Sequence, residues 1–151
     1  MHADRLGRVL VEQGVITDDQ WRQALTRQRM DSRPIGLIIA EMFSLEENKL
    51  WEACAAALAR ECPQVHLAHE PFDPACLSII SAHDAWDYLV LPLRQEKGEL
   101  VCATAWETLA SAIGLLHRCC PTPFRFVLAP VHPLEQFIAE RYAYEGVEIA
   151  E

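Results

Sequence analysis

The chain has 151 residues and a net charge of −9 at neutral pH, and it is 51% hydrophobic and 23% charged. This composition is typical of a folded globular protein and excludes a disordered or low-complexity chain. Its apolar runs are far shorter than the ~20 residues of a membrane span, and no apolar leader follows a basic N-terminus. We therefore predict neither direct membrane insertion nor secretion.

Charge is unevenly distributed along the chain. Residues 1–33 contain six arginines and five acids, whereas residues 34–151 contain seven cations and seventeen acids. A nucleic-acid-binding protein would have a broad basic face, so we predict no nucleic-acid partner, although a small anion could bind near the N-terminus. The six cysteines include no C-x-x-C pair, which favours reduced thiols and a cytoplasmic location.

The first 62 residues predict two copies of a helix pair. A shift of 29 residues aligns apolar positions in the same order, giving the pairs Leu6/Ile35, Gly7/Gly36, Leu10/Ile39, Trp21/Leu50 and Leu25/Cys54. Such a repeat is typical of a duplicated helical unit. In the first copy, Asp4 is a candidate cap for a helix from about Arg5 to Gln13, and Gly14 would end that helix in a left-handed conformation.

Local signals place the remaining three helices of this part. Thr17 and Gln20 form a capping box for a helix that ends near Arg29. Pro34 suits the first turn of a third helix. We expect Ser44 and Glu47 to form a second capping box for a helix that ends near residue 60.

The rest of the chain predicts a linker and then a small α/β lobe. Residues 63–83 contain three prolines, and Asp73-Pro74 reads as the start of a short helix. Residues 88–94 and 99–105 are strand-like and flank Lys97-Gly98, which indicates a hairpin, with Pro92 at an edge or bulge. A helix (108–119), a third strand (124–129) and a helix from Pro133 complete a lobe over 84–146. The predicted class is α+β, with a four-helix repeat lobe before a mixed three-stranded sheet.

No catalytic or metal-binding motif stands out in the sequence. The chain contains neither G-x-x-x-x-G-K-[ST] nor G-x-S-x-G, so we predict no enzyme and no catalytic residue. Cys62, His66, His69 and Cys76 are residue types that bind zinc and lie within fifteen residues of one another, but their spacing matches no recognised zinc pattern. We therefore predict no metal site and no cofactor.

The first repeat carries a family resemblance. Its pattern R-L-G-x-x-L-V-x-x-G-x-I, followed by A-L-x-x-Q, resembles the N-terminal domain of type II secretion and type IV pilus assembly ATPases, including the cyclic di-GMP-binding version called MshEN. The segment YLVLPLRQEKGELVCATA resembles the second half of that domain. In the binding members each copy contacts half of the dinucleotide, which implies ligand contacts at Arg5, Leu6, Gly7, Leu10, Trp21, Leu25, Gln28 and Gly36.

The chemistry of these residue types suits such a ligand. The Arg5 guanidinium can stack on guanine or pair with phosphate, and the Gln28 amide can bond to a base edge. Gly7 has no Cβ and permits a close approach. We expect Arg5 and Gln28 to lie along one groove with an apolar floor of Leu6, Trp21 and Leu25.

The second copy departs from the pattern, because it carries Pro34, Phe43 and Ala57 at the positions of arginine, glycine and glutamine. Two functions therefore remain open. The first is a non-catalytic regulatory domain that binds cyclic di-GMP mainly through the first repeat. The second, which the resemblance also implies, is a docking module for the cytoplasmic part of an inner-membrane secretion platform protein.

Overall fold

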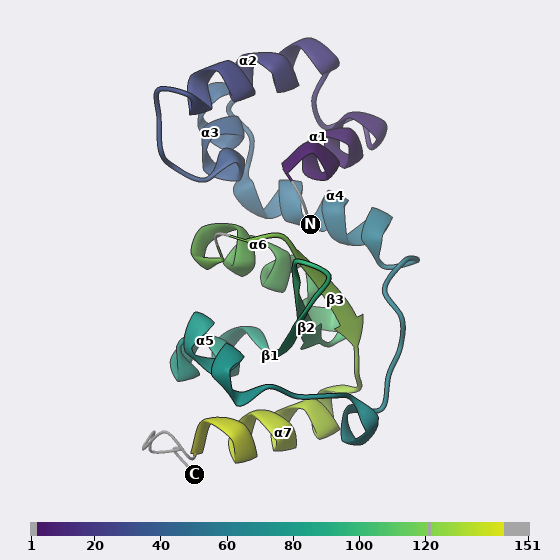
Figure 1. Cartoon of the computed structure of the whole chain (residues 1–151). Coiled ribbons are helices and arrows are strands. Elements are labelled where there is room, and N and C mark those ends of the chain that lie inside the picture. Colours follow the sequence, from purple (N-terminus) through teal and green to yellow (C-terminus); the bar gives the residue numbers. More distant parts are fainter. Residues whose placement is uncertain (1–2, 121, 144–151) are drawn as a thin grey trace.

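Four helices form the N-terminal lobe: α1 (Ala3–Glu12), α2 (Asp18–Gln28), α3 (Ile35–Met42) and α4 (Glu47–Leu58). The computed structural model describes residues 3–120 and 122–143, and Figure 1 shows this lobe stacked on a second lobe that contains the sheet. The predicted α+β class is confirmed. Asp4 lies within α1, and its side chain, and with it the expected cap, falls outside the described residues.

The start of α2 follows the local sequence closely. The Thr17 hydroxyl accepts a hydrogen bond from the Gln20 amide at 3.1 Å, and the Gln20 side chain accepts one from the Thr17 amide at 2.9 Å. This reciprocal pair satisfies two amide groups at the exposed end of the helix. The predicted capping box is confirmed.

Helices α1 and α3 end in the same way, but at positions that the repeat alignment did not pair. Gly14 has φ +74° and Ser44 has φ +54°, so each is the left-handed residue after its helix. In each case the amide of the residue that follows the left-handed one closes the turn. The Val15 amide donates to the Leu10 carbonyl at 3.0 Å, and the Leu45 amide donates to the Ala40 carbonyl at 2.9 Å.

Ser44 therefore ends α3 and does not cap α4, so the second predicted capping box is wrong. The residue before α4 is Glu46, which makes no side-chain cap, and Pro34 stands just before α3 rather than within its first turn. Ser44 cannot cap α4 because its backbone adopts the left-handed conformation that ends α3, whereas an N-cap residue has an extended backbone.

The conformation of Ser44 predicts a stabilising substitution. A left-handed backbone costs a non-glycine residue roughly 1–2 kcal/mol, which a glycine at this position would not incur. Part of that gain in stability is offset because glycine has more freedom in the unfolded chain. We expect Ser44→Gly to raise the free energy of unfolding by about 0.5–1 kcal/mol, measured by urea denaturation. Gly14→Ser is the matched reverse change and should lower it; the same sign in both variants would contradict the assignment.

The second repeat is one residue longer than the 29-residue alignment assumed. Gly7 faces Trp21 and Gly36 faces Trp51, so Trp21 corresponds to Trp51 rather than to Leu50. The extra residue lies between Gly36 and Ser44. As a result, Gly14 corresponds to Ser44 rather than Phe43, and Gln28 to Leu58 rather than Ala57.

The second lobe contains the predicted three-stranded mixed sheet, and its strands lie in the order β1-β2-β3. Strand β1 (Val90–Glu96) pairs antiparallel with β2 (Glu99–Thr104), and β2 pairs parallel with β3 (Phe124–Leu128). Lys97 and Gly98 both have positive φ and close the hairpin, and the register shifts between Pro92 and Arg94. The proline therefore lies at a bulge of an outer strand, where it removes no central hydrogen bond.

Helices enclose this sheet on both sides. Helix α6 (Leu109–Cys119) connects β2 to β3 and packs on α4, whereas α7 (Val131–Ala143) packs against β1 and β2 at the far end of the molecule (Figure 1). Helix α7 begins two residues before the predicted Pro133. Short helix α5 (Ala82–Tyr88) and the 3₁₀ segment η3 (Trp106–Thr108) complete the lobe.

Residues 63–83 pack along the sheet lobe. They contain the 3₁₀ segments η1 (Leu67–His69) and η2 (Pro74–Ile79), and the Asp73 side chain caps η2 at the Ala75 amide, as the Asp-Pro pair predicted. Gln64 bridges to Leu128, and the Asp73 amide donates to the Leu93 carbonyl at 2.7 Å. The division of the chain at residues 62 and 83 stays a prediction.

Trp51 joins the two lobes. Its side chain is 3% exposed, and its ring lies against Gly36 of α3 and Gly114 of α6. It also stacks on His117, with ring centroids 4.9 Å apart, and its indole N–H donates to Glu47 at 3.1 Å. Because Trp51 contacts both helical layers, the two lobes share one hydrophobic core.

Candidate functional site: a groove beside Arg5

Several residues that the resemblance implies as ligand contacts are core residues. Leu6 and Leu10 are fully buried. A Cβ on Gly7 would lie 2.0 Å from the Trp21 ring, and one on Gly36 would lie 2.3 Å from the Trp51 ring. Helix packing therefore accounts for both glycines, and the close approach they permit is to a tryptophan.

Arg5 lies at the side of α1 that faces the end of α4. Its guanidinium forms an ion pair with Glu61, and both side chains are about half exposed. Arg5 borders two adjoining depressions of the surface. The larger one, which we call the α1–α4 groove, has a volume of about 570 Å³ and is lined by Arg5, Arg8, Val9, Glu12, Gln13, Ala56, Ala57, Leu58, Arg60 and Glu61.

The α1–α4 groove is locally basic. It contains three arginines and two glutamates, in a chain whose net charge is −9. Arg8 and Arg60 are exposed, and neither forms an ion pair with any residue that the structure describes. Unpaired guanidinium groups on α1 and just beyond the end of α4 suit a ligand with negative charge.

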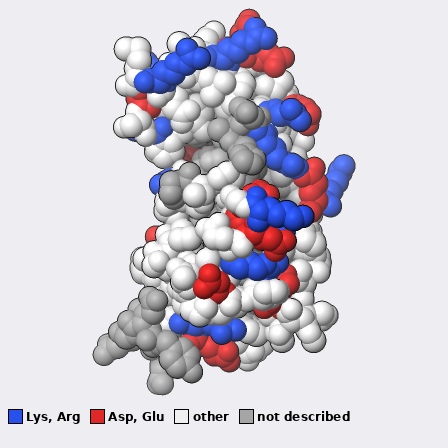
Figure 2. Space-filling model, in the orientation of Figure 1, with Lys and Arg blue, Asp and Glu red and all other residues white. Residues whose placement is uncertain are grey.

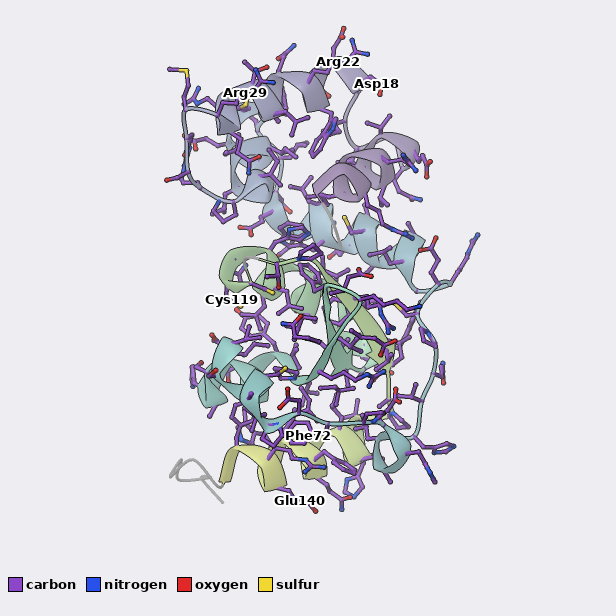
Figure 3. All side chains as sticks on the ribbon, in the orientation of Figure 1. Asp18, Arg22, Arg29, Phe72, Cys119 and Glu140 are labelled. Carbon is purple, nitrogen blue, oxygen red and sulfur yellow. The ribbon has the colours of Figure 1, made fainter. Side chains whose placement is uncertain are left out.

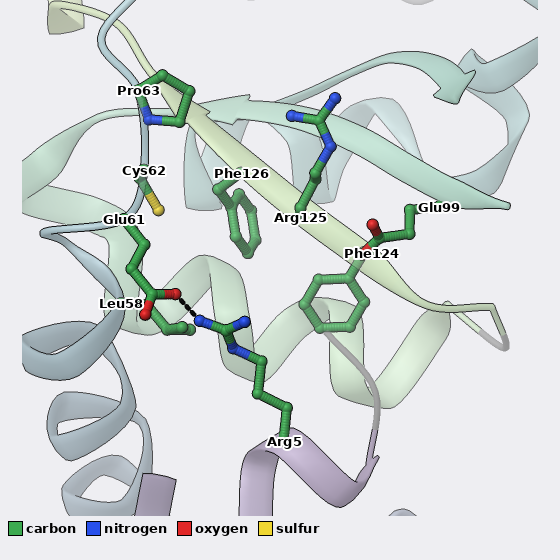
Figure 4. Close-up of a pocket in the computed structure, with 9 residues that line it drawn as sticks. All are labelled: Arg5, Leu58, Glu61, Cys62, Pro63, Glu99, Phe124, Arg125 and Phe126. Carbon is green, nitrogen blue, oxygen red and sulfur yellow. Dashed lines mark ion pairs between the residues drawn. The ribbon is translucent and has the colours of Figure 1, made fainter. Parts of the chain in front are cut away.

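The second depression, which we call the interlobe hollow, lies between α1, the end of α4 and strand β3 (Figure 4). Its volume is about 230 Å³, and it shares Arg5, Leu58 and Glu61 with the groove. Its other lining residues are Cys62, Pro63, Glu99, Phe124, Arg125 and Phe126. Burial raises the pKa of the Cys62 thiol, and the nearby Arg5 opposes this effect.

Gln28 lies outside both depressions that Arg5 borders. Gln28 is half-buried in the last turn of α2 and lines neither the groove nor the hollow. Trp21 lines a separate depression between α1 and α2, together with Gly7 and Arg8, and Leu25 is half-buried on α2. Arg5 and Gln28 therefore share neither of these two depressions, and the ligand roles of these residues stay predictions.

Basic side chains also occur at the outer end of the helical lobe. Figure 2 shows Lys and Arg side chains along this end of the molecule, over α2. Figure 3 shows Arg22 and Arg29 there, with Asp18 nearby. The Arg22 side chain is 77% exposed and lies 3.9 Å from Asp19, a distance at which a solvated ion pair contributes little.

The cysteine and histidine residues form no metal centre in the described part of the chain. His66 and His69 contact each other edge to face at 6.1 Å. Within residues 3–120 and 122–143, no group of three or more His, Cys, Asp or Glu side chains is placed to hold a metal ion. All six cysteines are free thiols. The same residues include no helix of the length and apolar character that crossing a bilayer requires.

The profile of the MshEN domain matches residues 60–148, which is more than half of the chain. The chain belongs to the MshEN domain family. The matched region of this MshEN domain begins at Arg60 and covers the sheet lobe, with most of the interlobe hollow. The first-repeat motif that contains Arg5 lies before it.

The chain is also similar to other proteins at low sequence identity. The type IV pilus assembly ATPase PilB of Myxococcus xanthus (strain DK1622) is 23% identical over 142 residues, which cover 94% of this chain but 25% of PilB. Among solved structures, MshE with cdg is 25% identical with a TM-score of 0.49, covering 91% of this chain and 98% of that one. The N-terminal domain of XpsE is 17% identical with a TM-score of 0.47, covering 94% and 96%.

The sequence did not single out half of the residues around the candidate site of this MshEN domain. Arg60 and Glu61 stand at the end of α4, where they read as ordinary polar residues before a linker. Glu99 and Phe124 belong to strands far along the chain. No local pattern marks these residues. Arg60 and Glu61 meet Arg5 because α4 packs on α1, and Glu99 and Phe124 meet it because the two lobes pack together.

Proposed function

We propose that this MshEN domain is a non-catalytic regulatory domain that binds cyclic di-GMP in the α1–α4 groove. The observation that supports this proposal is the meeting of Arg5, Arg8 and Arg60 around one depression of an otherwise acidic chain. The groove volume of about 570 Å³ falls within the ~300–1,000 Å³ that is usual for small-molecule sites. The first-repeat motif supplies the independent reason to consider a guanine dinucleotide.

The groove offers the groups that phosphates need. A guanidinium can donate two parallel hydrogen bonds to phosphate oxygens, and it does so best where few protein carboxylates compete. Arg8 and Arg60 meet this condition, whereas Arg5 must exchange Glu61 for the ligand. In the second repeat, Leu58 stands at the position of Gln28 and gives the groove an apolar side chain. The arginines of α1 and Arg60 would therefore provide most of the affinity.

Calorimetry with cyclic di-GMP tests the proposal. Each charge-assisted hydrogen bond is worth on the order of 1.5–3 kcal/mol, so Arg5→Ala should weaken binding by about tenfold or more. Arg22→Ala is the matched control, because Arg22 is exposed on α2 and lines neither the groove nor the hollow. Absence of heat with folded wild-type protein, or equal loss in both variants, would overturn the proposal.

A second function is favoured because the second repeat keeps its packing residues and has lost its polar motif residues. Gly36 and Trp51 serve packing on α6, and none of the polar motif residues of the first copy recurs. In such a domain the repeat frame supports a docking surface, for which the candidate partner is the cytoplasmic part of an inner-membrane secretion platform protein. Capture of that partner equally by wild type and Arg5→Ala, without any effect of cyclic di-GMP, would favour docking.

A further inference from the structure

The four helices of the N-terminal lobe have an internal two-fold arrangement. Helix α2 packs on α1 and α3, and α4 likewise packs on α3 and α1, so exchanging the two repeats reproduces the contacts. The tryptophans agree with this exchange, because Trp21 of α2 lies on Gly7 of α1 and Trp51 of α4 lies on Gly36 of α3. The outward side of α2 is therefore the counterpart of the outward side of α4 (Figure 1).

Helix α6 covers the outward side of α4. A Cβ on Gly114 would lie 2.7 Å from the Trp51 ring, and the His117 ring stacks on the same indole at 4.9 Å. Arg118 forms an ion pair with Glu47 at 3.3 Å. The contacts thus run from the middle to the end of α6 and from the middle to the start of α4, so the two helices are antiparallel.

Helix α2 has no such cover among the described residues. It packs on α1 and α3, and Figure 1 shows it at the end of the molecule away from the sheet lobe. Trp21 is only half-buried and borders a depression of about 440 Å³ between α1 and α2. Asp18 lines the same depression, is exposed, and forms no ion pair with a residue that the structure describes. A tryptophan and a nearby carboxylate are the two features of α4 that α6 contacts.

We propose that the Trp21 face, formed by Asp18, Trp21 and the depression beside them, binds an amphipathic helix of a partner protein that carries the α6 pattern. In this pattern a glycine permits close approach to the indole, and a ring three residues later stacks on it. A basic residue comes next and meets the carboxylate. Residues three and four apart share one side of a helix, so a single helix can present all three groups. The inference rests on the docking function proposed above, because it names the surface and the chemistry of the partner.

The charges of α2 favour the same antiparallel orientation. Helix α2 begins with Asp18 and Asp19 and has Arg27 in its last turn, and the exposed Arg29 follows. A helix laid antiparallel on α2 would place its C-terminal end beside the acids and its N-terminal end beside the arginines. Helices favour basic residues at the C-terminal end and acidic residues at the N-terminal end, so such a partner complements α2 at both ends.

The Trp21 face is less apolar than its counterpart on α4. With the tryptophans aligned, the buried Leu50 and Leu58 of α4 correspond to the half-buried Gln20 and Gln28 of α2. Permanent interfaces are more hydrophobic than transient ones. We therefore expect the partner helix to bind reversibly, whereas α6 stays packed on α4 as part of the fold.

The probe is a fluorescently labelled peptide of residues 107–118, which contains the α6 pattern. A lactam between Glu107 and Ser111→Lys, one helical turn apart, holds it helical, because short free helices are marginal in water. We expect fluorescence anisotropy to show binding to the full chain, and Gly114→Leu in the peptide to weaken it by about tenfold or more. Leucine favours a helix more than glycine does, so weaker binding reports the lost close approach. Absence of binding to folded protein, or equal binding of both peptides, would overturn the inference.

Variants of the full chain test the face itself. Trp21→Ala and the exposed Asp18→Arg should each weaken binding of the unchanged peptide, because the first removes the indole and the second repels the basic end of the peptide. Glu140→Arg is the matched control for the charge reversal, since Glu140 is exposed on α7 at the opposite end of the molecule (Figure 3). Equal affinities for Asp18→Arg and Glu140→Arg would contradict the assignment.

Photocrosslinking locates the bound peptide. A photoreactive leucine at position 115 of the peptide should crosslink to residues 17–28 of the full chain, as mapped by mass spectrometry. Crosslinks to residues 47–58 would instead show that the peptide displaces α6 from α4, and this result would overturn the inference.

Failure of the inference and failure of the docking function give different results. If the platform protein is captured equally by wild type and Asp18→Arg, the docking function holds and the Trp21 face is the wrong surface. If the peptide binds the Trp21 face but the platform protein is not captured, the surface is correct and the candidate partner is wrong. Binding of cyclic di-GMP in the α1–α4 groove is decided separately by its own calorimetry.

Discussion

Replacement of Trp51 by alanine is expected to lower the free energy of unfolding by about 3–5 kcal/mol, the usual range for removing a large buried aromatic side chain. Trp51 is 3% exposed and fills the space between Gly36, Gly114 and the His117 ring. The cavity would lie between two helical layers, where the backbone cannot collapse without separating the lobes. Urea denaturation followed by circular dichroism measures the change.

Trp21→Ala is the matched control for this prediction. Trp21 packs on Gly7 in the equivalent place of the first repeat, but it is only half-buried and borders a surface depression. Its loss should therefore cost clearly less than the loss of Trp51. Equal effects of the two substitutions would show that Trp51 has no special role between the lobes.

Acidification is expected to destabilise the fold through His117. Burial lowers the pKa of His117 from 6.5 to about 4, and its Nε2 has no hydrogen-bond partner among the described residues. Since the unfolded chain binds a proton near pH 6.5 and the folded chain does not, stability is full above pH 6.5, falls as the pH drops and levels off near pH 4. The pKa difference corresponds to roughly 3 kcal/mol of lost stability.

The variant His117→Phe isolates this effect. Phenylalanine keeps a ring against Trp51 and Phe124 but cannot bind a proton. The free energy of unfolding, measured at several pH values between 7 and 4, should therefore decline less in the variant than in the wild type. Parallel curves for the two proteins would contradict the assignment to His117.

The parts of the fold that were predicted correctly are those that depend on a few adjacent residues. The Thr17–Gln20 capping box, the left-handed Gly14, the Lys97-Gly98 hairpin turn and the bulge at Pro92 each follow from local backbone chemistry. The mixed sheet then follows, because an antiparallel hairpin followed by a helix crossover leaves a third strand parallel to the second.

The alignment of the two repeats was wrong by one residue because the apolar pattern fits two neighbouring alignments. Leu50 and Trp51 are adjacent and both apolar, so a shift of 29 or 30 residues preserves the pattern equally well. Only the contact of each tryptophan with its glycine distinguishes the two. The expected cap at Ser44 had another origin: the local pattern of Ser44 and Glu47 matches a capping box, but the left-handed backbone of Ser44 ends α3 instead.

The candidate site was predictable on one side only. Arg5 was singled out by the motif, but its actual neighbours are Glu61, Arg60 and Phe124 rather than Gln28. These neighbours depend on how α4 and β3 are placed relative to α1. This placement depends on tertiary packing, and the spacing of residues along the sequence does not predict it.

The contact of one indole with two glycines constrains how this chain can diverge. A methyl group at Gly36 would lie 2.3 Å from the Trp51 ring, and one at Gly114 would lie 2.7 Å from it. A homologue with alanine at either position must therefore carry a smaller side chain in place of Trp51. We expect these three positions to covary, so that their identities in distant homologues report whether the same lobe arrangement has been inherited.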